Sequence, residues 1–344
     1  MKKIFITGES GTIPLQIQII ANNFGFEIVN TQLKYNFLTP LKKHQSFKVR
    51  KPEIDFLDIE CLEKMPWKEI DLVIHSGAFV GTDFCASDPN LSIKTNVEGT
   101  QNIVNFCNRN SIPLIYLSTT AILDPKDYGL FKPINEKTKI NPQTLYGITK
   151  YSGELIVKNL CSSKYLILRP VFGFGSYPDD LHSALTKIIY IMYKNLVEKT
   201  ENNLVVLLDK LINKSYTRVE NIASCILSLA KKYFFEDFKF YNDIINIGEN
   251  FSKSKNWFQI FEIIAYSFAI KGICTTFEFY NSIEKWVRFL PAKDYLHYHN
   301  MDDSKLLNFN LNFEKLLNYI PLDEGINLTV DSVIENSKIQ PYWL

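Results

Sequence analysis

The chain has 344 residues, of which 46% are hydrophobic and 22% are charged, and its 38 basic residues nearly balance its 37 acidic ones. These proportions are typical of a globular protein that buries a full core, and a net charge of +1 offers little attraction for nucleic acid or an anionic membrane. The six cysteines are scattered without a Cys-x-x-Cys pair, which predicts reduced, buried thiols and no zinc site. No apolar run reaches the roughly 18 residues of a membrane span, and Gly8 interrupts the first apolar run too early for a signal peptide. We therefore expect a cytoplasmic globular protein.

The N-terminal stretch predicts a strand followed directly by a glycine turn and a helix. Residues 2–7 are apolar and partly β-branched, the sequence Gly8-Glu-Ser-Gly11-Thr-Ile-Pro14 follows, and residues 15–24 form an apolar helix candidate. This order of elements directs backbone N–H groups and a helix N-terminus towards a pyrophosphate. Taken alone, the two glycines fit a nucleotide-binding turn and an ordinary tight turn equally well.

Strands and helices alternate through the first half of the chain. Apolar residues recur at helical spacing over residues 91–108. Further strands are predicted at residues 26–29, 54–59, 71–74, 112–117 and 165–168. This alternation predicts an α/β fold with a doubly wound, mostly parallel sheet.

The strict alternation is lost after residue 175. Helices are predicted at residues 181–196, 219–232 and 257–270, and short strands at residues 204–208 and 244–247. We predict a large domain over residues 1–175, with returning elements near residues 215–250. A smaller lobe, interleaved with it, is predicted over residues 176–344.

Polar residues at the ends of the predicted strands are candidates for ligand binding, because open α/β sheets bind ligands at the carboxyl ends of their strands. The hydroxyl cluster Ser118-Thr-Thr120 follows one such strand, although similar clusters commonly serve turns and caps. His75 ends another strand, and we expect a packed or hydrogen-bonded structural histidine, since no acid or nucleophile is suitably spaced. His297 and His299 share a period-2 face without a third ligand nearby, so we predict no metal site.

Tyr146 and Lys150 form the pattern with the clearest chemistry. They are four residues apart, so on a helix both side chains project from the same face. A tyrosine has a reference pKa of about 10, and a neighbouring ammonium lowers that pKa by stabilising the phenolate, towards the range where proton transfer is efficient. The same spacing occurs on many solvated helix faces, so the interpretation depends on the rest of the chain.

The order of these motifs resembles that of the extended short-chain dehydrogenase/reductases, in the NAD-dependent epimerase/dehydratase branch. The resemblance is carried by the glycine turn, in which Pro14 stands where a third glycine is usual, by Asn96-Val-Glu-Gly99-Thr, and by the Tyr146 and Lys150 pair. Later segments that match are Arg169-Pro, Arg218-Val-Glu-Asn-Ile-Ala223, Asn246-Ile-Gly248, Asp303-Ser-Lys305 and Asp323-Glu-Gly325. The match extends over nearly the whole chain and implies a Rossmann-type domain with a smaller, mainly C-terminal substrate-binding lobe.

The resemblance implies NAD or NADP as the cofactor and Thr119, Tyr146 and Lys150 as the catalytic residues. Tyr146 would exchange a proton with a substrate oxygen, Lys150 would lower the tyrosine pKa and bind the nicotinamide ribose, and Thr119 would hold the substrate oxygen. The cofactor contacts implied are Gly8, Gly11, Thr12, Ile13, Asn30, Asp58, Ile59, Ser76, Gly77, Ala78, Asn96, Tyr146, Lys150 and Val171. The substrate contacts implied are Thr119, Thr120, Phe172 and Arg288. Asn30 is neither the acid that favours NAD nor a base that favours NADP, so the choice between them stays open.

Departures from the family pattern bear on the substrate. Thr120-Ala121 replaces the acidic pair of the dehydratases, so 4,6-dehydration is not expected. Phe172 replaces an asparagine of many nucleotide-sugar enzymes, and Val80 replaces a lysine of the hexose epimerases. Arg288 lies where relatives place an arginine on the substrate diphosphate, although a surface ion pair explains it equally well.

Two activities follow. The late-chain match and Arg288 favour a nucleotide-sugar epimerase or ketosugar reductase. Phe172 and Val80 favour an NADPH-dependent reductase of a non-sugar aldehyde, ketone or carrier-bound thioester. A cofactor-binding regulator without turnover is disfavoured because Tyr146 and Lys150 are both present. By the same analogy we expect a homodimer formed through the helix that carries Tyr146 and the helix before it.

Overall fold

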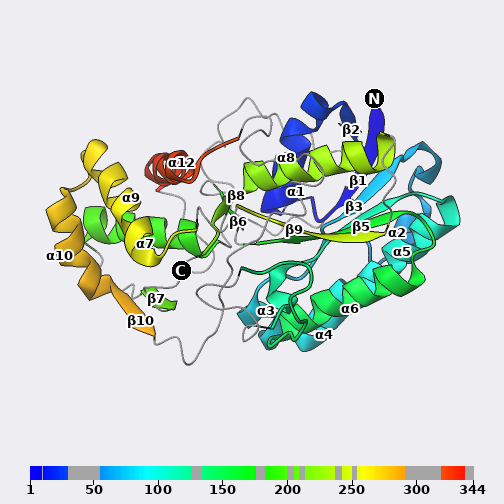
Figure 1. Ribbon diagram of the computed structural model, residues 1–344, viewed down its shortest axis with the longest axis horizontal. Coiled ribbons are helices and arrows are strands. Elements are labelled where there is room, and N and C mark those ends of the chain that lie inside the picture. The colour runs from blue at the N-terminus through cyan, green and yellow to red at the C-terminus, as the bar shows by residue number, and fades with distance from the viewer. Residues whose placement is uncertain are drawn as a thin grey trace.

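A computed structural model describes residues 1–9, 11–29, 55–124, 133–171, 173–175, 183–199, 205–208, 214–236, 242–249, 254–290 and 319–337. Its main feature is a six-stranded sheet in the order β2-β1-β3-β4-β5-β9, in which every neighbouring pair is parallel (Figure 1). The strands are β1 (Lys2–Thr7), β2 (Phe26–Ile28), β3 (Leu72–His75), β4 (Leu114–Leu117), β5 (Tyr165–Pro170) and β9 (Asp243–Ile247). Parallel neighbours require crossover connections, and the predicted doubly wound α/β fold is confirmed.

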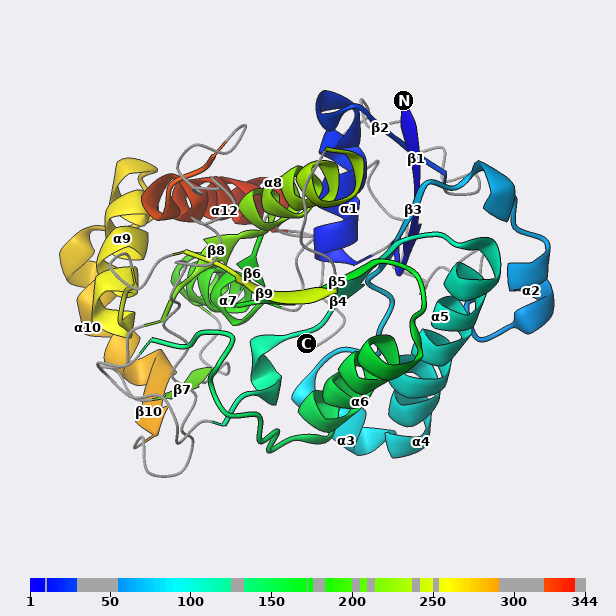
Figure 2. The ribbon, with the colours of Figure 1, turned by 45° about the vertical axis from the view of Figure 1, so that its right-hand side comes forward.

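Helices cover both faces of the sheet. On one face α1 (Thr12–Ile20) contacts α8 (Val219–Ala230), and on the other α5 (Gly99–Asn110) contacts α6 (Leu145–Leu160) (Figure 2). All residues of β3 and β4 are buried, as is usual for strands of a parallel sheet covered on both sides. Both α8 and β9 come from the second half of the chain and return to the main sheet. The division of the chain at residue 175 stays a prediction.

The helix predicted at residues 91–108 has an interruption. It consists of α4 (Pro89–Ile93), a π-helical turn at Lys94–Glu98, and α5. Asp88 caps α4 by accepting a hydrogen bond from the Leu91 N–H (3.0 Å). A π-helical turn adds one residue to a helix and is often found at functional sites. The neighbouring α3 (Thr82–Ser87) contacts both α4 and α6.

The smaller lobe has its own apolar core. The helices α7 (Ala184–Glu198), α9 (Trp257–Ile270), α10 (Thr276–Trp286) and α12 (Leu322–Asn336) surround it. Asn256 and Gln259 form a capping box at the start of α9, and the helix predicted at residues 257–270 is confirmed. Two short parallel pairs complete the lobe: β7 (Val205–Leu208) with β10 (Val287–Leu290), and β6 (Gly173–Phe174) with β8 (Thr217–Arg218).

Arg218 of β8 joins the short β6–β8 pair to α12. Its Nη1 donates to Thr329 Oγ1 (2.9 Å) on α12 and to the Gly325 carbonyl (3.3 Å), and its guanidinium carbon lies 5.5 Å from the centroid of the Phe174 ring. A Cβ at Gly325 would lie 2.7 Å from the Arg218 side chain, so the glycine is what lets α12 approach β8.

The prediction of a strand at residues 54–59 is wrong over residues 55–59, which the structure describes. Residues 55–57 form a turn, and Asp58 caps α2 (Ile59–Glu63) by accepting from the backbone N–H groups of Glu60 (2.9 Å) and Cys61 (3.2 Å). An aspartate at an N-cap stabilises the helix start, and this local chemistry outweighs the apolar pattern around it. Among the described helices, none has both the length and the apolar character needed to cross a bilayer.

Candidate active site

The turn between β1 and α1 depends on close packing of glycine. Gly8 has a φ of 68°, and a Cβ on it would lie 2.5 Å from the Cα of Gly77 in the loop after β3. The Gly11 N–H donates to the Gly8 carbonyl (2.9 Å), and α1 begins at the next residue with Gly11 as its N-cap. The first backbone N–H groups of a helix have no partner within it and can bind an anion such as a pyrophosphate. Pro14 is buried in this first turn, where it removes no helical hydrogen bond, so it does not disturb the turn.

His75 is the structural histidine that the sequence predicts. The ring is 0% exposed, with Nδ1 2.6 Å from Thr7 Oγ1 and Nε2 3.1 Å from Thr100 Oγ1. Because Thr7 Oγ1 accepts from the Gly77 N–H (2.9 Å), its hydroxyl hydrogen can be donated to Nδ1, which places the ring proton on Nε2. Burial, with a smaller effect of the Lys150 charge, lowers the pKa of His75 to about 3. The ring therefore stays neutral over the physiological range.

The loop after β3 carries three predicted cofactor contacts. Ser76 Oγ donates to the Thr7 carbonyl, and Ala78 is half-buried. A Cβ at Gly77 would lie 2.5 Å from the ring of Phe56, so this glycine is required by packing within the protein. The loop is thereby held against the end of β1 and the glycine turn.

Asn96 lies in the π-helical turn with its side chain 1% exposed. Its Oδ1 accepts from the Phe79 N–H (2.7 Å), and its Nδ2 donates to the Phe79 carbonyl (3.0 Å) and to Thr149 Oγ1 (2.9 Å). Thr149 in turn donates to the Tyr146 carbonyl (3.0 Å). Asn96 thus joins the segment after β3 to the first turn of α6. Its predicted contact with a cofactor stays a prediction.

The structure brings Thr119 and Tyr146 together. Thr144 caps α6 by accepting from the Gly147 N–H (3.1 Å), which places Tyr146 in the first helical turn. Burial raises the pKa of Tyr146 to about 12, although a hydrogen bond with the Thr119 side chain acts in the opposite direction. The predicted lowering of this pKa towards neutrality is therefore wrong here, because burial disfavours the phenolate more than its neighbours stabilise it. The phenol is protonated at neutral pH.

Lys150 lies one turn further along α6 and is 2% exposed. Its Nζ is 4.3 Å from the centroid of the Tyr116 ring, which favours the ammonium through a cation–π contact. Burial lowers the pKa of Lys150 to about 7, while the Glu154 charge acts against this shift. The lysine therefore changes its charge near neutral pH.

Sequence reasoning missed the role of Glu154. This residue is 0% exposed and forms a bidentate ion pair with Arg169 of β5, in which both nitrogen–oxygen distances are 2.7 Å. Tyr146, Lys150 and Glu154 follow one another at intervals of four residues, so they lie along one stripe of α6. The sequence signal for this role was the position of Glu154, four residues after Lys150 on the same stripe.

The remaining predicted substrate and cofactor contacts lie in different parts of the fold. Thr120 is 3% exposed and follows β4, and Val171, a predicted cofactor contact, is 5% exposed and follows β5. Arg288 lies on β10 of the lobe, in register with Val206 of β7. The predicted cofactor contacts Asp58 and Ile59 are exposed at the start of α2.

Several predictions fall on residues that the structure does not describe. They are Asn30, Phe172, His297 and His299. Among the residues that it does describe, no group of three or more His, Cys, Asp or Glu side chains is placed to hold a metal ion.

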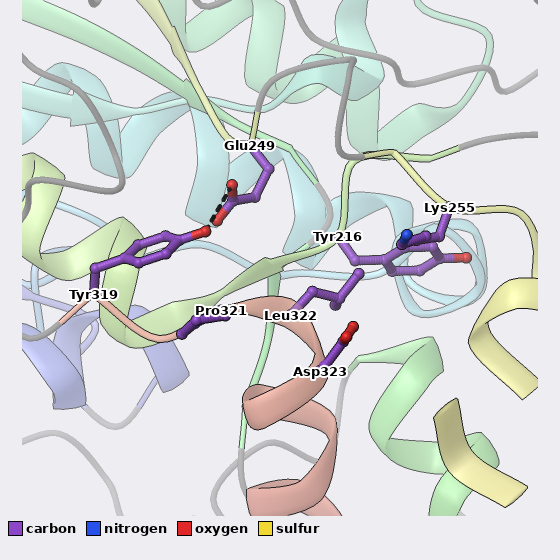
Figure 3. Close-up of a pocket in the computed structure, with 7 residues that line it drawn as sticks. All are labelled: Tyr216, Glu249, Lys255, Tyr319, Pro321, Leu322 and Asp323. Carbon is purple, nitrogen blue, oxygen red and sulfur yellow. Dashed lines mark hydrogen bonds between the residues drawn. The ribbon is translucent and has the colours of Figure 1, made fainter. Parts of the chain in front are cut away.

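A cavity of about 230 Å³ lies where the segments before β8 and after β9 meet the start of α12 (Figure 3). It is lined by Tyr216, Glu249, Lys255, Tyr319, Pro321, Leu322 and Asp323. Glu249 is 4% exposed and accepts from the Tyr319 hydroxyl (3.3 Å) and Asn221 Nδ2 (3.5 Å). Its lining includes none of the predicted site residues that the structure describes, so it is distinct from the surroundings of Tyr146.

The fold and these residues define an NAD(P)-binding α/β enzyme of the short-chain dehydrogenase/reductase kind. Residues 1–274 match the family described as RmlD substrate binding domain. The chain therefore belongs to this family, and it is an enzyme of the extended short-chain dehydrogenase/reductase type. The resemblance inferred from the motifs is confirmed.

Two relatives from Methanocaldococcus jannaschii match most of the chain. One, named uncharacterized protein MJ1055, is 26% identical over 97% of this chain and 97% of its own length. The other, named putative UDP-glucose 4-epimerase, is 27% identical over 78% of this chain and 83% of its own length.

Solved structures show the same fold at lower identity. The Thermus thermophilus UDP-glucose 4-epimerase in complex with NAD has a TM-score of 0.67 and 19% identity, covering 96% of this chain and 98% of that one. RMD from Pseudomonas aeruginosa complexed with NADPH has a TM-score of 0.69 and 14% identity, covering 96% and 99%.

Proposed function

We propose that this enzyme is an NAD(P)-dependent epimerase or ketosugar reductase that acts on a nucleotide-linked sugar. The observation that carries the proposal is the contact between Thr119, after β4, and Tyr146 of α6, the helix that also holds the buried Lys150. These side chains gather at the carboxyl end of β4, where open α/β sheets bind ligands. The nucleotide-sugar class is supported by relatives and structural neighbours whose names include UDP-glucose 4-epimerase.

The residues of the glycine turn fit a dinucleotide. The tight contact of Gly8 with Gly77 and the helix start at Thr12 bring the N-terminus of α1 to this turn, where its positive dipole end favours a pyrophosphate. Solved neighbours contain NAD or NADPH, which supports NAD or NADP as the cofactor here. When bound, the nicotinamide supplies or accepts the hydride.

The protein residues manage the proton. In the reductive direction the Thr119 hydroxyl holds the substrate carbonyl oxygen, and the Tyr146 phenol transfers its proton to that oxygen as the carbon–oxygen π bond opens. In the oxidative direction the Tyr146 phenolate accepts the hydroxyl proton, and the Lys150 ammonium stabilises the phenolate. Because the pKa of Tyr146 is raised to about 12, the reductive direction starts from the dominant protonation state.

The second candidate function is an NADPH-dependent reductase of a non-sugar carbonyl compound. Val80 is 42% exposed and apolar where hexose epimerases carry a lysine, so this part of the loop after β3 offers no cation to a substrate. A protonated Tyr146 also suits a reaction that runs only as a reduction.

We also propose a homodimer built on α5 and α6. The apolar residues Ile148 and Leu155 on α6 are 48% and 39% exposed, and they lie seven residues apart on one helix face. The double variant Ile148→Asp/Leu155→Asp is expected to be a monomer by light scattering. A native protein that is itself monomeric at micromolar concentration would remove the proposal.

The first test of function identifies the nucleotide that the protein retains. The protein is purified without added cofactor and denatured, and the released nucleotide is identified by mass spectrometry. An epimerase oxidises and re-reduces the same molecule, so stoichiometric NAD supports epimerisation and calls for assays on nucleotide-sugar panels. A protein that releases no nucleotide and then binds NADPH supports net reduction, and a ketosugar panel against a non-sugar carbonyl panel separates the two candidates. Failure to bind NAD and NADPH alike would contradict both.

A further inference from the structure

Three buried polar residues stand side by side at the carboxyl ends of β4, β5 and β9. Arg169 of β5 is in register with Asn246 of β9. Ser118 follows β4 and donates its N–H to the Leu168 carbonyl (2.7 Å). It therefore lies beside Arg169 on the flank of β5 that is away from β9. Figure 2 labels these three strands, which are neighbours in the sheet. The exposed fractions are 6% for Ser118, 1% for Arg169 and 1% for Asn246.

The three side chains share one face of the sheet. Residues in register on neighbouring parallel strands point to the same side, and side chains two residues apart on one strand do so as well. Arg169 points towards α6, where it binds Glu154. Tyr116, two residues before Ser118, also points there, since its hydroxyl donates to the Lys150 carbonyl (3.2 Å). The row therefore lies between the sheet and α6.

Four atoms in this row lack a hydrogen-bond partner among the described residues. They are Ser118 Oγ, Arg169 Nη1, and Oδ1 and Nδ2 of Asn246. Buried polar atoms are nearly always paired with protein or with ordered water. Four such atoms on adjacent strands indicate one shared ligand site, whereas an isolated one would indicate only a local packing cost.

The spacing and charge of the row define the ligand. Neighbouring strands lie about 4.8 Å apart, so polar side chains in register on them project close enough for one water molecule to bridge them with two hydrogen bonds of about 2.8 Å each. The Arg169 charge is matched by Glu154 through two hydrogen bonds, so the row needs no counter-ion. It offers a hydroxyl, a guanidinium N–H and an amide, which together supply the two to four partners that a buried water uses.

We propose that Ser118, Arg169 and Asn246 form a binding site for two ordered water molecules between the sheet and α6. One water bridges Ser118 and Arg169, and the other bridges Arg169 and Asn246. Ser118 directly precedes Thr119 in the chain. The first water therefore links the segment that carries Thr119 to the ion pair between Arg169 of β5 and Glu154 of α6. The site does not rest on the proposed function, because it requires neither a cofactor nor a substrate.

A matched pair of serine substitutions tests the site by thermal unfolding. Ser267 on α9 is likewise buried, at 0% exposed against 6% for Ser118, and its hydroxyl has no partner among the described residues. It lies on a helix and does not belong to a row of strand residues in register. Ser118→Ala removes a hydrated hydroxyl and is expected to lower the melting temperature by roughly 2–4 °C. Ser267→Ala removes an unpaired one and is expected to leave that temperature unchanged or to raise it. Equal responses of the two variants would overturn the proposal.

A crystal structure at about 1.5 Å resolution tests the geometry. We expect two water peaks within hydrogen-bonding distance of the four atoms, and we expect the second to be lost in Asn246→Leu. Side chains that bond directly to one another, or a dry gap, would contradict the site. In a double-mutant cycle, Ser118→Ala and Asn246→Leu are expected to be less than additive, because both act on a connected pair of waters. Strict additivity together with unchanged water peaks would also count against the proposal.

Discussion

The two faces of the sheet are built from different kinds of residue. Under α1 and α8 the buried side chains are almost entirely apolar, with Ile4, Ile6, Leu117 and Leu168 facing Ile226 and its neighbours. Under α5 and α6 the sheet also buries ionisable groups: His75, Lys150, Glu154 and Arg169 are all at most 2% exposed. The apolar face stabilises the sheet through surface removed from water, whereas each buried charge on the other face depends on a particular partner. The chemistry of the enzyme is concentrated on the face that is harder to stabilise.

The largest effect is expected for activity on the polar face. Tyr146→Phe removes the phenolic proton, and because a positioned acid or base contributes about 10²–10⁴-fold in rate, turnover should fall by a factor of that order. Circular dichroism should show an unchanged fold. Tyr151→Phe, on the same helix, serves as the control and should keep its turnover. Turnover that survives in Tyr146→Phe would remove this residue from the mechanism.

Breaking the buried ion pair should give the largest effect on stability. Arg169→Met leaves the Glu154 carboxylate buried without its partner, at an expected cost of about 3–5 kcal/mol in the free energy of unfolding. The double variant Arg169→Met/Glu154→Leu should regain most of this loss, because no isolated charge remains. Urea denaturation measures both. A double variant as unstable as the single one would show that packing, not charge, governs the site.

The charge of Lys150 should make stability depend on pH. Its pKa is lowered to about 7 from an ordinary 10.5, so above pH 7 the unfolded chain binds more protons than the folded protein, and the free energy of unfolding rises with pH. One such group contributes at most about 1.4 kcal/mol per pH unit. Lys150→Met should reduce the slope between pH 7 and pH 8, below the range in which Lys214 contributes most, since burial lowers the pKa of Lys214 to about 8. An unchanged slope would mean that Lys150 keeps its proton in the folded protein.

The apolar face should respond least. Ile226→Val on α8 removes one methylene from a residue that is 0% exposed, at an expected cost of about 0.5–1.5 kcal/mol in the free energy of unfolding. Turnover should stay unchanged once the variant is folded. A loss of turnover in Ile226→Val would show that the apolar face also contributes to catalysis.

Elements that depend on apolar burial were also the easier ones to predict from sequence. Continuous apolar runs located β1, β4, β5 and β9, and the spacing of apolar residues located α9 to the residue. The strand at residues 54–59 was predicted wrongly because a single capping aspartate decides the local structure there. Local patterns describe elements well when burial is the only force that acts on them.

The polar face exposed the limits of that reasoning. The four-residue interval singled out Tyr146 and Lys150, and the family resemblance implied Thr119 within the hydroxyl cluster that follows β4. The raised pKa of Tyr146 and the pairing of Glu154 with Arg169 depend on how deeply α6 is buried against β4 and β5. That depth is a property of the assembled fold, and no spacing within one helix contains it.

The π-helical turn at Lys94–Glu98 makes the helix unusually sensitive to chain length. Removal of one residue from this turn would restore a regular α-helix, but the part before the deletion would rotate by roughly 100° relative to α5. Asn96 would then turn away from Phe79 and Thr149, and the first turn of α6 would lose its link to the loop after β3. Among homologous chains, single-residue insertions and deletions should therefore be rarer in this helix than in α7 or α9, which have no such turn.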